Sequence, residues 1–252
     1  FNDKYDTFFT SSAKRVFANC PKLKEIDVKN CFNNATDISE MFLNCTSLTK
    51  VTTSMNWCLL AKDASRIFSG CTALESISFG AGAFYSATNL SSMFENCTSL
   101  TSIIISNLNT SSAKNMLGMF LNCASVTSLD LSSFKTNLVT RMDLMFSQCV
   151  SLKYLNLSGF STEKVQQMKR MFYNCTSLTS LNLSNFNTSN VWMMVSIFNG
   201  CKKMQYLDLS SFNTTIARNM NGMFANCESL TSLNLSNFIK PPLIDIAEIF
   251  FK

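Results

Sequence analysis

The chain has 252 residues, of which 46% are hydrophobic and 15% are charged, and its formal net charge is +5. It contains no histidine, which excludes Ser-His-Asp and Cys-His nucleophile systems and imidazole metal sites. Its basic residues form no run of the kind that follows a phosphate backbone, and no apolar stretch reaches the ~18 residues of a membrane-spanning helix. We therefore expect no enzyme, no metal or cofactor, no nucleic-acid partner and no membrane insertion within this chain.

Cysteines recur along the chain at a fixed interval. Eight of them follow one another every 26 residues, and one more precedes the first by 25: Cys20, Cys45, Cys71, Cys97, Cys123, Cys149, Cys175, Cys201 and Cys227. The decapeptide SLTSLNLSNF occurs at 177–186 and again at 229–238. A period of this length indicates a solenoid, in which neighbouring units bury the same positions against each other and so favour the same residues.

From the N-terminus, residues 1–15 are expected to form a partial first turn or cap. The early units at 51–61 (VTTSMNWCLLA) and 77–87 (ISFGAGAFYSA) lack the later leucine pattern, so we expect irregular turns there. Cys58, which lies in the first of them, is predicted to be an exposed thiol. No linker interrupts the series, and residues 1–252 are expected to form a single solenoid domain.

The unit after Cys175 shows the expected structure of one repeat. Leu181 and Leu183 alternate with a polar residue, which predicts a strand with one buried face. Thr188 and its polar neighbours supply caps for an apolar stripe that begins at Val191 and has helical spacing. Asparagine or glycine precedes nearly every regularly spaced cysteine, which predicts a left-handed backbone there. We therefore expect about nine strand-turn-helix units and an α/β solenoid with a parallel sheet on one face.

The chain ends shortly after Ile249-Phe250, inside another repeat. We expect an open, apolar edge at these two residues, where end-to-end self-association can occur.

The sequence resembles the BspA-like, or treponeme-type, leucine-rich repeats. The resemblance rests on the L-x-x-L-x-L run followed by an aromatic and by N-C-x-S-L, as in MFYNCTSL (171–178) and MFANCESLTSLNLSNF (223–238). It is strongest with the 26-residue form found in bacterial surface proteins and lipoproteins. The resemblance implies a cell-surface or extracellular location, with the anchor and signal outside this chain, and a role in adhesion or host interaction.

The regularly spaced cysteines allow three interpretations, namely disulfides, metal ligands or a buried column of thiols. Metal sites favour C-x2-C clusters, which are absent from the sequence. Each cysteine lies on the apolar stripe beside a phenylalanine, where a small thiol packs well. We favour free, buried thiols.

The strand positions that point to solvent, on the expected concave side, are the candidate binding surface. Most are small and polar, but two tyrosines stand out near acidic and amide side chains: Tyr154, Tyr206, Asp130, Asn156, Asn182 and Asp208. Tyrosines beside such acceptors can hold a protein loop or stack on a sugar ring, so the expected ligand is an unidentified protein or glycan.

Two functions fit these features. The first is a non-catalytic, surface-displayed binding module, adhesin-like or host-interacting, that uses the strand face or exposed loops. The second is a structural scaffold whose open ends stack on one another.

Overall fold

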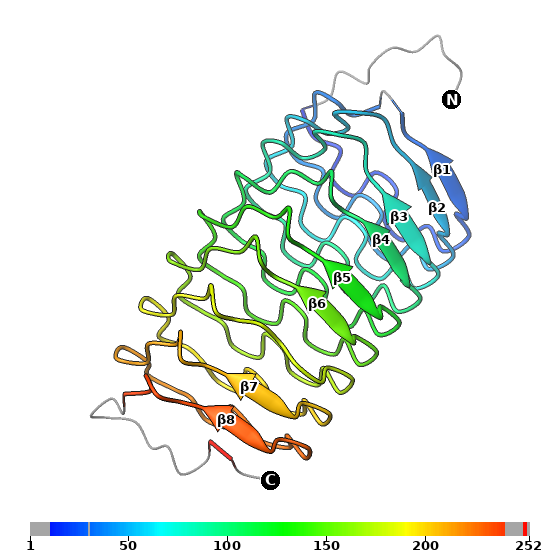
Figure 1. The fold of residues 1–252 in the computed structure, drawn as a ribbon. Coiled ribbons are helices and arrows are strands. Elements are labelled where there is room, and N and C mark those ends of the chain that lie inside the picture. Colours follow the sequence, from blue (N-terminus) through cyan, green and yellow to red (C-terminus); the bar gives the residue numbers. More distant parts are fainter. Residues whose placement is uncertain (1–10, 30, 240–248, 251–252) are drawn as a thin grey trace.

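The computed structural model describes residues 11–29, 31–239 and 249–250, and the chain in these ranges winds into a solenoid of stacked turns (Figure 1). Ten of the first fifteen residues, expected to form a cap, lie outside the described residues. Eight turns carry a short strand on the same face: β1 (Glu25–Asp27), β2 (Lys50–Thr52), β3 (Ser76–Ser78), β4 (Ser102–Ile104), β5 (Ser128–Asp130), β6 (Tyr154–Asn156), β7 (Tyr206–Asp208) and β8 (Ser232–Asn234). We call this side of the molecule the strand face.

The strands pair in parallel, as the repeat predicts, but only two at a time. β1 pairs with β2, β3 with β4, β5 with β6, and β7 with β8. In each pair equivalent positions of neighbouring repeats face each other, so that Leu129 lies opposite Leu155. The strand predicted in the unit after Cys175 is not formed. Residues 180–182 run between β6 and β7 and pair with neither strand.

The predicted helices are wrong: no helix forms in the described residues, and the fold is a β-solenoid of strands and turns. The segments expected to be helical, such as residues 142–149, form successive turns on the side we call the turn face. Leu144 and Gln148 have φ values of 59° and 65°, and an α-helix cannot pass through such residues because all of its φ values lie near −63°. The left-handed residue before each cysteine is thus confirmed, although it ends a turn and not a helix.

The turn face carries a continuous ladder of hydrogen bonds between turns. Over residues 142–148, the alternate N–H groups of Met142, Leu144, Phe146 and Gln148 donate to carbonyls of the next turn, with N–O distances of 2.7 to 3.0 Å. The same four bonds recur at every step from the turn of Phe17 to the turn of Phe198. Because these N–H groups bond to the next turn, they are not available for the bonds within one segment that a helix needs.

Phenylalanines stack through the core in two columns. The column next to the turn face runs from Phe17 to Phe250, with ring centroids 5.3 to 5.9 Å apart. The second column follows the strands from Phe134 to Phe238, with centroids 6.3 to 6.4 Å apart. Both sets of distances exceed the ~4.8 Å between paired parallel strands.

Buried threonines join the turns at the corner after the strands. The Thr162 hydroxyl donates to the carbonyl of Asn187 at 2.8 Å and accepts from the N–H of the same residue at 2.7 Å. Four equivalent threonines make the same double contact: Thr110, Thr136, Thr188 and Thr214. They therefore connect turns and do not cap helices. In the early units Cys58 and Phe84 take this position with positive φ, so the corners there are of a different kind.

Candidate functional site

The structure places all six candidate binding residues on or beside the strand face. Tyr154 and Tyr206 begin β6 and β7, and their side chains are 55% and 50% exposed. Alternate residues of a strand point to opposite sides of the sheet. Leu155 and Leu207, which directly follow the two tyrosines, are buried in the core, so the tyrosines point to solvent.

The acidic and amide candidates also shape the backbone. One side-chain oxygen of each accepts a hydrogen bond from the N–H two residues later, as Asp130 does from Ser132 at 3.0 Å and Asn182 from Ser184 at 3.0 Å. Asn156 and Asp208 form the same turn. The Ser132 N–H lowers the pKa of the Asp130 carboxyl. These side chains are therefore held in place at the ends of strands or, for Asn182, at the end of the unpaired segment, with part of their polar capacity already used.

Between the two tyrosines, residues 180–182 leave their backbone N–H and carbonyl groups unpaired within the described residues. The Leu183 N–H is unpaired as well, but the Leu183 carbonyl accepts from the Phe186 N–H and the Ser211 hydroxyl, both at 2.9 Å. No hydrogen bond from the N–H of Ser180, Leu181, Asn182 or Leu183 forms within the part of the chain that the structure describes. In the neighbouring β5–β6 pair, by contrast, the Leu131 N–H donates to the Asn156 carbonyl at 2.9 Å. This segment thus offers free polar backbone groups on the strand face.

Open hollows lie on both sides of this segment. One, of about 310 Å³, is lined by Tyr154, Asn156, Ser158 and neighbouring residues up to Asn185. The other, of about 330 Å³, lies between residues 180–184 and Tyr206, Asp208, Ser210 and Ser211. The Tyr206 hydroxyl donates to Asp208 at 3.3 Å, which holds the ring beside the second hollow. The two hollows, with a tyrosine on each, form the tyrosine site.

A further hollow was not predicted from the sequence. It measures about 620 Å³ and lies over β2, β3 and β4, where the β2–β3 pairing is interrupted. Half of its lining residues are serine or threonine, and the others include Lys50, Phe79 and the 57% exposed Ile104. The sequence carried two signals for it, namely Ile104, an apolar residue at a solvent-facing strand position, and the irregular segments 51–61 and 77–87, whose first residues line the hollow.

The regularly spaced cysteines are free thiols, as favoured from the sequence, and most are buried. Each thiol from Cys45 to Cys227 donates to the carbonyl of a phenylalanine one turn earlier, as Cys149 does to Phe120 at 3.1 Å. Burial raises the pKa of Cys149 to about 12. The expected exposure of Cys58 is wrong: its side chain is fully buried at the irregular corner, and burial raises its pKa.

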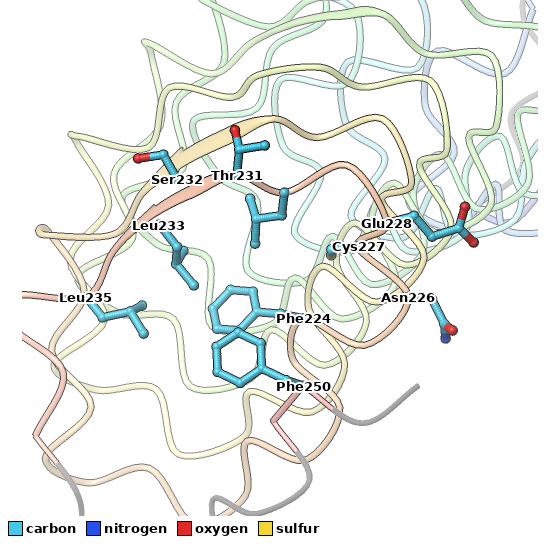
Figure 2. A pocket seen from close by; sticks show the side chains of 10 residues that line it. Phe224, Asn226, Cys227, Glu228, Thr231, Ser232, Leu233, Leu235 and Phe250 are labelled. Carbon is cyan, nitrogen blue, oxygen red and sulfur yellow. The ribbon is translucent and has the colours of Figure 1, made fainter.

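The last described turn ends in an open hollow of about 720 Å³, shown in Figure 2, whose lining mixes apolar side chains with polar ones such as Asn226, Glu228 and Thr231. The Ile249 carbonyl accepts a hydrogen bond from Phe224 and its side chain is buried. Phe250 stacks on Phe224 at a centroid distance of 5.3 Å and is 58% exposed. Leu233 and Leu235 lie on the strand side of the same hollow (Figure 2).

Two further expectations concern metals and membranes. Within the described ranges, cysteines and carboxylates form no group of three or more that could hold a metal ion. The same residues contain no helix with the length and apolar character needed to cross a bilayer.

Stacked parallel turns with buried leucine columns define a leucine-rich-repeat solenoid, a class of generally non-enzymatic scaffolds that typically bind proteins. The chain belongs to the family described as "Mycoplasma protein of unknown function, DUF285", whose profile matches residues 62–176 and 151–252. Residues 4–85 match the profile "BspA type Leucine rich repeat region (6 copies)", which confirms the resemblance seen in the sequence. No curated protein matches the chain.

Several solved structures are similar to the chain at low identity. A leucine-rich repeat protein from Bacteroides ovatus is 17% identical with a TM-score of 0.45, and the aligned region covers 89% of this chain and 63% of that protein. A leucine-rich cell surface protein from Faecalibacterium prausnitzii is 16% identical with a TM-score of 0.44, with 90% and 63% covered. An internalin from Listeria monocytogenes is 17% identical with a TM-score of 0.32, with 87% and 69% covered. The chain therefore spans less than two thirds of the first two proteins.

Proposed function

We propose that residues 1–252 form one domain that acts as a non-catalytic, surface-displayed binding module, adhesin-like or host-interacting, and that it holds its ligand at the tyrosine site. The observation that carries the proposal is the coincidence of two exposed tyrosines with two hollows and an unpaired backbone segment. The ligand is a protein or a glycan.

The physical argument rests on rigidity and on aromatic area. Tyrosine offers a large contact surface at a small entropic cost, because only two side-chain angles are fixed on binding. The Asx turns of Asn182 and Asp208 hold the rim of the hollows in place before a ligand arrives. A preorganised surface of this kind loses less free energy on binding than a flexible one.

The test compares binding by the chain with binding by its Tyr154→Ala/Tyr206→Ala variant on a panel of matrix proteins and immobilised glycans. We expect the variant to stay folded and to lose about tenfold or more in affinity for whatever the wild type binds. The matched control is Tyr85→Ala, since Tyr85 is equally exposed, at 55%, but lies outside the strands. If the double variant binds as tightly as the wild type, the proposal that the ligand binds at the tyrosine site is contradicted.

Surface display is tested separately, by protease treatment of intact source cells. The proposal predicts that this region is cut while a cytosolic marker survives. Protection until the cells are lysed would contradict display, whether or not the chain binds a ligand.

A self-associating scaffold is the second candidate, favoured by the exposed ring of Phe250 on the open hollow at the last described turn. Its test is the sedimentation of the wild type and of Phe250→Glu. A concentration-dependent assembly that the charge abolishes supports end-to-end stacking through Ile249 and Phe250. A wild type that stays monomeric at high concentration excludes it.

A further inference from the structure

We infer that the tyrosine site binds a linear, uncharged oligosaccharide. This inference rests on the proposed binding function of the strand face and narrows its ligand to one chemical class. Three features of the site carry it: the mixed polarity of its floor, the near absence of charge in its lining, and the spacing of its two aromatic rings.

The floor of the site mixes hydrogen-bond donors and acceptors. The unpaired N–H groups of residues 180–183 are donors, and the carbonyls of residues 180–182 accept no hydrogen bond from the described part of the chain. The oxygen of the Asn182 side chain already accepts from Ser184, which leaves its NH2 group to donate. A hydroxyl group both donates and accepts, so a polyhydroxylated ligand can pair with both kinds of group at once.

A polypeptide strand fits this floor poorly. Backbone groups of an extended segment point sideways toward the neighbouring strands, and here β6 and β7 already occupy both sides. Too little room remains for another strand to add to the sheet between them. Small groups such as hydroxyls can enter the hollows from solvent and reach the same backbone atoms.

The lining is almost free of charge. Serines, asparagines, leucines and the two tyrosines make up the walls, and Asp208 is the one charged side chain among the residues lining these two hollows. A sulfated or sialylated chain would meet a carboxylate and no lysine or arginine. Desolvation of an unpaired anion is costly, so an uncharged ligand is favoured.

The two rings are too far apart for one sugar. Tyr154 and Tyr206 are separated by two repeats, and each of these two steps measures 6.4 Å in the phenylalanine column beside the strands. Each ring presents an apolar face that can pack against the C–H face of a sugar. One pyranose can therefore contact one tyrosine, and only a chain of sugars that crosses residues 180–184 can contact both.

The experiment is titration calorimetry of the chain with glucose-, N-acetylglucosamine- and mannose-based linear oligosaccharides of increasing length, alongside sulfated and sialylated chains. We expect affinity for a neutral series to rise with length until both tyrosines are covered. Tyr154→Ala and Tyr206→Ala should each lower the affinity for the long oligosaccharide by about tenfold. Each should also abolish the increase of affinity with oligosaccharide length. Tyr85→Ala should change neither, and circular dichroism should confirm that all variants are folded.

Two results would overturn the inference. One is binding of anionic chains alone, or of no oligosaccharide at all. The other is a partner whose binding needs both tyrosines but survives enzymatic deglycosylation, which would leave the proposed binding function intact while excluding a sugar ligand. If neither tyrosine substitution changes any binding by the chain, the proposed binding function of this site is contradicted as well.

Discussion

The turn face and the strand face of this solenoid are held together in different ways. On the turn face, four N–H groups of each turn bond to the next turn at every step from Phe17 to Phe198, and a stacked phenylalanine column lies directly beneath. On the strand face, pairing stops after every second strand, and residues 180–182 pair with neither neighbour. The turn face is thus the continuous structural element of the solenoid.

This difference separates stability from binding. Substitutions on the turn face disturb contacts that repeat through the whole stack, whereas strand-face side chains such as Tyr154 protrude into solvent. A protein built in this way can change its binding residues without losing its fold. The following predictions test that separation, beginning with the largest expected effect.

Raising the pH should destabilise the protein through the buried thiols. Burial raises the pKa of Cys97 and Cys149 from an ordinary value of 9.0 to about 12. Because the folded pKa exceeds the unfolded one, the thiol contribution to stability is complete below pH 9 and is lost as the pH rises toward 12. In this window each such thiol lowers the free energy of unfolding by on the order of 1 kcal/mol per pH unit. The urea midpoint of unfolding should therefore be much lower at about pH 10 than at about pH 8.

The matched control for the pH experiment is Cys149→Ala, whose stability should fall less steeply because one buried thiol is gone. A urea midpoint that stays level to about pH 10 would contradict the burial of the cysteine column.

Removing one ring from the stack should be the costliest single substitution among those proposed. Phe146 is fully buried between Phe120 and Phe172, so Phe146→Ala leaves a cavity and is expected to cost about 3–5 kcal/mol of unfolding free energy. Chemical denaturation checks this value. A loss below about 1 kcal/mol would show that the stack is not under the packing constraint described here.

The threonine contact between turns should be worth less. Thr162→Val removes the hydroxyl that pairs with both backbone groups of Asn187, and the loss of these two part-buried hydrogen bonds, worth about 0.5–1.5 kcal/mol each, is expected to cost about 1–3 kcal/mol. Thr162→Ser retains the hydroxyl and is the matched control. If the serine and valine variants are equally unstable, the hydroxyl contact is not the cause.

On the strand face, the same kind of aromatic truncation should leave stability almost unchanged. Tyr154→Ala removes a ring that is 55% exposed, and the expected change in unfolding free energy is within about 0.5 kcal/mol. Thermal or urea unfolding of Tyr154→Ala and of Phe146→Ala under the same conditions compares the two faces directly. A loss at Tyr154 as large as that at Phe146 would remove the distinction between them.

The sequence predicted the repeat, its buried columns and the left-handed residue before each cysteine, because asparagine and glycine there have a clear backbone preference. It did not reveal the second left-handed position four residues earlier, because only Gly118 and Gly222 there have that preference and the other turns carry residues such as Glu40, Leu144 and Arg170. An apolar stripe that recurs every three or four residues fits successive turns as well as it fits a helix, and the helix prediction failed for this reason.

The candidate site could be predicted only in part. The outward positions of Tyr154 and Tyr206 followed from strand alternation, whereas the hollows did not. The decapeptide at 177–186 is identical to that at 229–238, yet the second contains β8 and the first contains no strand. Pairing at residues 180–182 therefore depends on the neighbouring turns and not on the segment's own residues.

Native-state hydrogen exchange of individual backbone amides tests the central claim most directly. The account predicts slow exchange at Phe120, Phe146 and Phe172, whose N–H groups bond between turns, with opening free energies near that of global unfolding. It predicts fast exchange at Ser180, Leu181 and Asn182 under the same conditions. Equal protection of the two groups, or slower exchange at residues 180–182, would contradict the account.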